Sequence, residues 1–170
     1  MTVNFENESG RTFPFDPEEI ARQVIRVSLQ AVSCPYEAEV SLLITDKDVI
    51  HEMNLTYRGI DRETDVLSFP LQEYDRPGDF EKFEDPKAES GSFDPDSGEF
   101  LLGDIVISAD RVVSQAKEFG HSEKREFAFL VAHSMLHLTG FDHMEEGERQ
   151  QMEEMQRKIM ELAGIGRDAV

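Results

Sequence analysis

Three of the five histidines lie within eleven residues, in the segment HSMLHLTGFDH from His133 to His143. His133 and His137 are four residues apart, and the run before them is typical of a helix, so we expect both imidazoles on one helical face about 6 Å apart. Gly140 follows at a distance where helices often end in a left-handed glycine, and such a turn would carry His143 back toward the other two. The spacing predicts a metal site of three imidazoles.

Three imidazole ligands are typical of catalytic zinc. With three nitrogen ligands at about 2.0–2.1 Å, a tetrahedral zinc ion keeps its fourth position for water, whereas four protein ligands close a structural site. A fourth protein ligand, such as Cys34 or Asp142, would make this a closed, structural site. Other divalent ions also accept imidazole, so the spacing does not fix the metal. The simple structural alternative is two histidines that stabilise a helix C-terminus.

The same spacing occurs in the metzincin metalloproteases, in which a glutamate after the first histidine is the general base. Ser134 occupies that position here. Because a serine hydroxyl cannot accept a proton near pH 7, the pattern favours the metal and disfavours peptide hydrolysis.

Hydrophobic periodicity and capping residues predict the elements that position the histidines. We expect an α+β fold, with a mixed sheet of about four strands packed with helices and a zincin-like metal helix. Asp16, followed by Pro17, and Asp46 are candidate N-caps. The metal helix should face the sheet through Phe127, Leu130, Val131 and Leu138. The predicted strands cover residues 3–5, 37–45, 65–69 and 101–108, and the predicted helices 17–31, 47–58, 109–119, 123–139 and 145–163.

Composition indicates one globular domain over residues 1–170, with 39% hydrophobic residues and a mean hydropathy of −0.47. Cys34 is the single cysteine, so no internal disulfide can form, and the N-terminal residues do not resemble a signal peptide. We therefore expect a cytoplasmic protein. The longest apolar run near the motif, residues 127–132, is far shorter than the roughly 20 residues of a membrane span.

The net charge of −19 has the wrong sign for binding polyanions over a broad surface, so any contact with nucleic acid must be local or assisted by a partner. Much of the acidity lies between Leu71 and Phe100, a segment with proline, glycine and serine but no sustained period. We interpret this acidic segment as a solvated, mobile loop insertion in preference to a binding lid.

The histidine motif resembles the signature of the YbeY family of bacterial rRNA-processing endoribonucleases. Two further segments fit the same family, NLTYRGIDRETDVLSFP (54–70) and LGDIVIS (102–108). Glu63 departs from the family pattern, which usually has proline there, and the acidic segment is longer than usual. The resemblance implies a zinc-bound, single-strand-selective ribonuclease that acts in ribosomal RNA maturation and ribosome quality control, with His133, His137 and His143 as ligands. It also implies binding to RNA of the 16S type and to the small ribosomal subunit, including a small-subunit ribosomal protein and an Era-type GTPase.

Arg58 is the candidate for stabilising negative charge on phosphorus, because a guanidinium binds phosphate oxygens in a bidentate manner. An exposed arginine that ends a helix is the alternative, and the resemblance favours the functional interpretation. Asp142 either orients a histidine or forms a turn beside Gly140. Thr64 and Asp65 are expected mainly to cap the turn into the following strand, although both can shape the rim of the site.

The remaining candidates are interpreted as structural. We expect His51 and His121 to be surface histidines, since neither has a partner at ligand spacing. The methionines at 152, 155 and 160 follow helical spacing and are expected to pack in the core.

Two functions therefore stay open. The first is a metal-dependent endoribonuclease that uses metal-activated water. The second is a ribosome-assembly factor with a structural metal, which the acidic charge supports because it suits basic ribosomal proteins. A metalloprotease is third.

Overall fold

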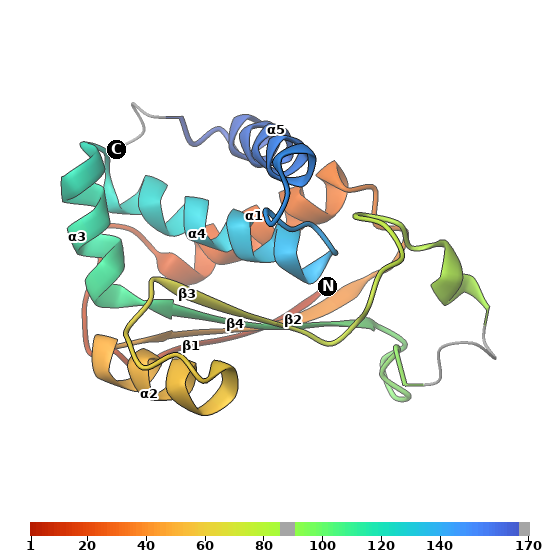
Figure 1. Ribbon diagram of the computed structural model, residues 1–170, viewed down its shortest axis with the longest axis horizontal. Helices are drawn as coiled ribbons and strands as arrows, with labels where there is room; N and C mark the ends of the chain where they lie inside the picture. The colour runs from red at the N-terminus through yellow and green to blue at the C-terminus, as the bar shows by residue number, and fades with distance from the viewer. Residues whose placement is uncertain (86–90, 167–170) are drawn as a thin grey trace.

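The computed structural model describes residues 1–85 and 91–166 and has an α+β architecture (Figure 1). Its four strands form one sheet in the order β1-β2-β4-β3. The strands β1, β2 and β4 run parallel, and β3 pairs antiparallel with β4 at an edge of the sheet. The predicted four-stranded mixed sheet is therefore confirmed. The strands are β1 (Thr2–Asn7), β2 (Ala38–Thr45), β3 (Val66–Pro70) and β4 (Phe100–Ser108).

Helices cover the two faces of the sheet unequally (Figure 1). The helices α1 and α4 pack on one face, with α5 against both and α3 beside α4, while α2 lies on the opposite face. None of the helices in the described ranges combines the length and the apolar character of a bilayer span. The helices are α1 (Pro17–Ala31), α2 (Lys47–Arg58), α3 (Ala109–Phe119), α4 (Glu123–Leu138) and α5 (Glu146–Leu162).

Side-chain caps fix where the helices begin. The carboxylate of Asp16 accepts the backbone N–H groups of Glu18 and Glu19, and Asp46 does the same for α2. Each cap satisfies donors that have no partner inside the helix. Both predicted N-caps are confirmed, and the predicted elements agree with the observed ones to within about two residues at each end.

The helix α4 is the centre of the core. The four residues predicted to face the sheet are all buried, and so are residues on its other sides, because α1, α3 and α5 surround the helix. The predicted core methionines also agree, since Met152 and Met160 are buried and Met155 packs against the core. A helix enclosed in this way gives its C-terminal histidines a fixed support.

The acidic segment differs from our prediction. Within its described part, a short 3-10 helix at Glu81–Glu84 follows Phe80, and the side chains of Phe80 and Phe83 are buried. Both rings pack edge-on against Phe100, and Tyr74 packs against both. The prediction of a solvated insertion is therefore wrong for these aromatic residues, which join the core, whereas most of the acidic residues around them are exposed. Residues 86–90 lie outside the described part of the chain.

Candidate metal centre

The turn after α4 is built around a glycine. Thr139 ends the helix, the N–H of Gly140 donates to the carbonyl of His137, and the N–H of Phe141 donates to the carbonyl of Leu136. These two bonds form the Schellman motif, which requires a left-handed residue at the glycine position. Gly140 has φ of +96°, and a Cβ atom there would lie 2.9 Å from Cβ of Tyr74. Only glycine fits both the conformation and the space.

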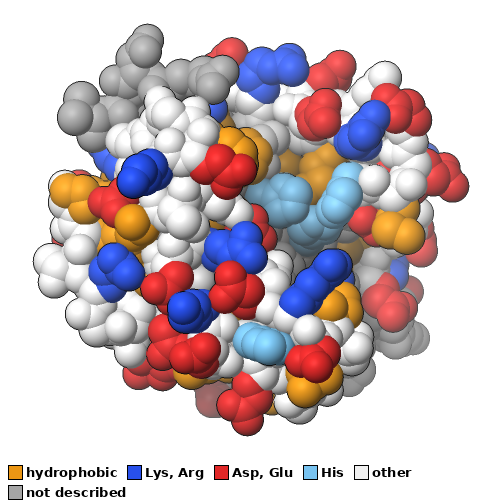
Figure 2. All heavy atoms as spheres, turned by 60° about the vertical axis from the view of Figure 1, so that its left-hand side comes forward, with side chains coloured by type: hydrophobic (Ala, Val, Ile, Leu, Met, Phe, Trp, Pro, Cys, Tyr) orange, Lys and Arg blue, Asp and Glu red, His pale blue; other side chains and the backbone are white. Residues whose placement is uncertain are grey.

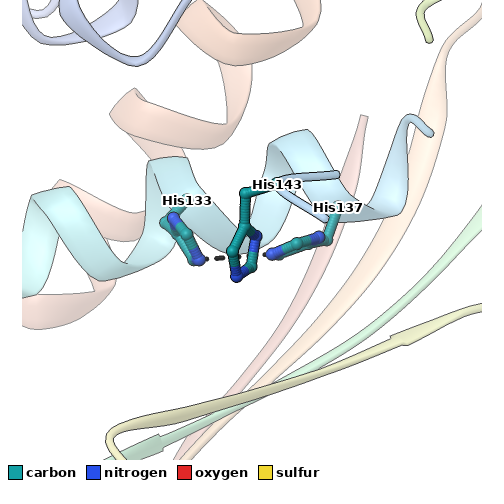
Figure 3. Close-up of side chains that lie close together, drawn as sticks. All are labelled: His133, His137 and His143. Atoms are coloured by element: carbon teal, nitrogen blue, oxygen red, sulfur yellow. Dashed lines mark hydrogen bonds between the residues drawn. The ribbon is translucent and has the colours of Figure 1, made fainter. Parts of the chain in front are cut away.

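This turn brings the three histidines together, as predicted. His133 and His137 project from α4, and His143 returns from the following segment, so that the three rings face one another (Figure 3). One ring nitrogen from each histidine lies within 4.8 Å of the others, and the Nε2 atoms of His133 and His137 are 3.2 Å apart. Nitrogens bound to one tetrahedral zinc ion are separated by about 3.4 Å, so the donors fit such an ion.

Hydrogen bonding and burial prepare the nitrogens for this role. His137 Nδ1 donates to the carbonyl oxygen of Phe141 at 3.1 Å, which leaves the lone pair on Nε2 directed at the other histidines. Burial, followed by the charge of His137, lowers the pKa of His133 to about 4. Burial also lowers the pKa of His137, followed by the charge of His143. Neutral imidazole is the form that binds metal ions, so all these effects favour binding.

Ser134, which stands where metzincins have their glutamate, is fully buried. Its hydroxyl lies 2.6 Å from the hydroxyl of Ser68 and joins α4 to β3. The position is therefore occupied by a structural contact and offers no proton acceptor to the site.

The histidines line a pocket of about 840 Å³ between α4 and β3. Figure 2 shows histidine side chains in a hollow of the surface, with lysine or arginine side chains close by and acidic ones around it. Arg58, at the end of α2, lines the same pocket, and its charge lowers the pKa of His137. Thr64 and Asp65 also line the pocket. Asp65 has the predicted capping contact as well, because its Oδ1 accepts the N–H of Val66 at 2.8 Å.

Other predicted residues lie elsewhere or act differently. Cys34 lines a separate pocket with Met1 and Tyr36, so it does not complete the histidine cluster. Asp142 accepts the backbone N–H of His143 at 2.7 Å, and its carboxylate is 3.7 Å from the ring nitrogen Nδ1 of that residue. Both contacts are to His143, so they fit the turn interpretation and the histidine-orienting interpretation of Asp142 equally. Among the described residues, the only metal-ligating cluster is the histidine triplet.

The two histidines predicted to lie at the surface differ from each other. His51 is at the surface and pairs with Asp61 at 2.7 Å. His121 is not a surface histidine, because only 9% of its side chain is exposed and its Nε2 lies 2.9 Å from a carboxylate oxygen of the buried Glu126. No sequence pattern indicated this pair, because Glu126 lies in the first turn of α4, where acidic residues are common.

The pocket wall formed by β3 and its flanks was not predicted as a unit. Apart from Asp65 and Glu73, its members alternate along the chain, as expected for one side of an extended segment, and this alternation was the signal that could have predicted the wall. The side chains of Gln72 and Tyr74 continue the wall into the acidic segment, which places part of that segment at the site. The alternating members are Thr64, Val66, Ser68, Pro70 and Gln72.

The fold and the site define a class of protein: an α+β protein with three converging histidines at the C-terminal end of a buried helix, open to a pocket that also contains an arginine. The family model described as Endoribonuclease YbeY matches residues 3–164. The chain belongs to the YbeY family of endoribonucleases.

Individual relatives agree with the family match. The chain is 52% identical over 167 residues to an endoribonuclease YbeY of Lachnoclostridium phytofermentans and 54% identical over 167 residues to that of Agathobacter rectalis, with 98% of this chain and 100% of each relative covered. The solution structure of TM1509 from Thermotoga maritima has a similar fold, with a TM-score of 0.58 and 24% identity, and the match covers 96% of this chain and 90% of TM1509.

Proposed function

We propose that this protein is a metal-dependent endoribonuclease that hydrolyses phosphodiester bonds in single-stranded RNA. The observation that carries the proposal is the convergence of three imidazole nitrogens at an open pocket that also contains Arg58. The relatives are named endoribonuclease YbeY, which supports RNA as the substrate. By resemblance to the family, we assign the activity to maturation of 16S-type ribosomal RNA and to ribosome quality control in the cytoplasm.

His133, His137 and His143 would hold the metal, which we propose to be zinc. Bound there, zinc would make an attacking water more acidic and would polarise a phosphoryl oxygen. Arg58 binds a non-bridging phosphate oxygen and stabilises the charge that develops on phosphorus. Because the protein as a whole is strongly acidic, such a local cation is needed to hold the phosphodiester at the histidines.

The structure favours this function over the two alternatives. A structural metal site is normally closed by four protein ligands, and the cluster in the described part of the chain has three. A metalloprotease would need an acidic residue at Ser134, where a buried hydroxyl pair stands instead. As partners in the cell, we propose the small ribosomal subunit, one of its proteins and an Era-type GTPase, all by resemblance to the family.

X-ray absorption at the zinc edge and a cleavage assay test the proposal together. The purified protein should show three nitrogen ligands and one water oxygen, and it should cleave a single-stranded RNA. His137→Ala should lose both zinc and cleavage, whereas His51→Ala, the matched change of a surface histidine, should keep both. Cleavage that survives in His137→Ala, or a zinc spectrum with four protein ligands, would refute the proposal.

A further inference from the structure

Asp65 is a carboxylate on the pocket wall opposite α4. It lies immediately before β3 and lines the pocket together with His133 and His137. Its negative charge raises the pKa of His133, although burial of the imidazole has the larger, opposite effect. The carboxylate is therefore within electrostatic reach of the histidine cluster while belonging to a different element.

A network of side chains holds this carboxylate in place. Gln115 of α3 donates from Nε2 to Oδ2 of Asp65 at 3.4 Å and to Oε2 of Glu126 at 2.9 Å. Because both hydrogens of one amide nitrogen point to carboxylates, the orientation of the amide is fixed. Glu126 is itself buried and contacts His121 through its other oxygen. Oδ1 of Asp65 accepts hydrogen bonds from the N–H of Val66 and the hydroxyl of Thr64, whereas Oδ2 accepts only the one from Gln115 and keeps a lone pair for a further donor.

Two other carboxylates line the pocket, Glu73 and Asp142, and both are exposed. Asp142 is also engaged with the backbone N–H of His143 on the α4 side of the pocket. Of these three carboxylates, only Asp65 is partly buried and held by a side chain of a helix, Gln115 of α3. Since Ser134 cannot serve as a base, the site needs a proton acceptor from another element, and Asp65 is placed to provide it.

We propose that Asp65 is the proton acceptor in phosphodiester hydrolysis and that Gln115 is its positioning residue. This inference rests on the proposed function. In the step, a lone pair of the Asp65 carboxylate takes a proton from the attacking water, and the electron pair of that O–H bond forms the new O–P bond. The P–O bond to the leaving ribose oxygen breaks, and its electron pair stays on that oxygen, which takes a proton from solvent. Asp65 then releases its proton to solvent.

The first test is Asp65→Asn, which keeps the shape of the side chain and removes its ability to accept a proton. The turnover number on a single-stranded RNA oligonucleotide should fall by about 100- to 10,000-fold, the usual contribution of a general base. KM and zinc affinity, measured by competition with a chromophoric chelator, should not change. In Asp65→Ala, added formate should restore part of the rate. The matched control is Asp61→Asn, an exposed carboxylate of the same loop that pairs with His51, and it should behave as wild type.

Gln115→Leu tests the positioning role. The single variant should lower the turnover number without changing zinc affinity, and the double variant with Asp65→Asn should be no slower than Asp65→Asn alone, because the amide acts only through that carboxylate. A fully additive loss in the double variant would show that Gln115 acts independently and would overturn the assignment.

Three results would overturn the role of Asp65: full activity in Asp65→Asn, a loss of activity matched by an equal loss of zinc affinity, or no formate rescue of Asp65→Ala combined with loss of activity in Asp142→Asn. A wild-type protein that binds zinc and does not cleave RNA would overturn the proposed function itself, and the inference with it. These outcomes distinguish a failure of the role assigned to Asp65 from a failure of the proposed function.

Discussion

Replacing Gly140 by alanine should destabilise the protein by an amount that the structure allows us to estimate. The left-handed backbone at φ +96° costs a non-glycine residue about 1–2 kcal/mol. The new Cβ would also lie 2.9 Å from Cβ and 3.0 Å from Cγ of Tyr74, and overpacking of this kind costs about 1–3 kcal/mol. The ring of Tyr74 cannot move away freely, because it packs against Phe80 and Phe83. We therefore expect a loss of about 2–5 kcal/mol in the free energy of unfolding.

Urea unfolding of the chelator-treated protein measures this loss without a contribution from bound metal. Two matched variants separate its causes. Gly164→Ala has a similar positive φ of +71° with open space around the new atom, so it should lose only the backbone cost. Gly147 lies in the first turn of α5 with nothing nearby, so Gly147→Ala should gain at most the roughly 0.5–1 kcal/mol of a site inside a helix.

The Gly140→Ala variant also tests the link between the turn and the histidine cluster. Because Gly140 sets the path from His137 to His143, Gly140→Ala should also weaken zinc binding, whereas Gly164→Ala should not. A loss of stability no larger than that of Gly164→Ala would refute the role of Tyr74, and unchanged zinc affinity would refute the role of the turn.

Three further predictions concern pH, phosphate binding and the hydroxyl pair. In the metal-free protein, stability should fall as the pH drops from about 6.5 toward 4, by up to about 3 kcal/mol, because burial lowers the pKa of His133 to about 4 and the unfolded chain takes up the proton first. Urea titrations across this range check the fall, and an equal fall in His133→Gln would contradict it. Arg58→Ala should lower kcat/KM for RNA cleavage by about 100- to 1,000-fold, as the loss of a charge-stabilising donor does, while Arg62→Ala, an exposed arginine of the adjoining loop, should have little effect. Ser134→Ala should cost about 1–3 kcal/mol in urea unfolding, because it leaves the Ser68 hydroxyl without its partner, and replacing both serines should recover part of the loss.

The histidine cluster could be predicted because its determinants are local. Two histidines at helical spacing and a glycine at the end of the helix lie within eleven residues, and the Schellman turn depends only on its own backbone. The helix caps at Asp16 and Asp46 are local in the same sense. The apolar character of β2 and β4 was enough to predict these two strands, because each of them buries at least every second side chain.

Two features that were missed have the opposite cause, since each depends on residues far apart in the chain. Phe80 is buried because Tyr36 and Phe100 meet it from other elements, and no pattern within the acidic segment shows this. The neighbourhood of Asp65 depends in the same way on Gln115 of α3. The pair of His121 and Glu126 is local, and it was missed because a glutamate in the first turn of a helix is normally exposed. A sequence pattern reports which residues can share a face, and it does not report which faces meet.

The aromatic residues of the acidic segment also bear on how freely this part of the chain can change its length. A connection of about 30 residues between β3 and β4 costs only about 2 kcal/mol more in loop-closure entropy than a four-residue hairpin loop. Burial of Phe80 and Phe83, worth about 1.5–3 kcal/mol each, offsets that cost within the connection itself. Insertions elsewhere in this connection therefore cost little free energy, whereas the part that contains Tyr74 packs on Gly140 and is tied to the turn that positions the histidines.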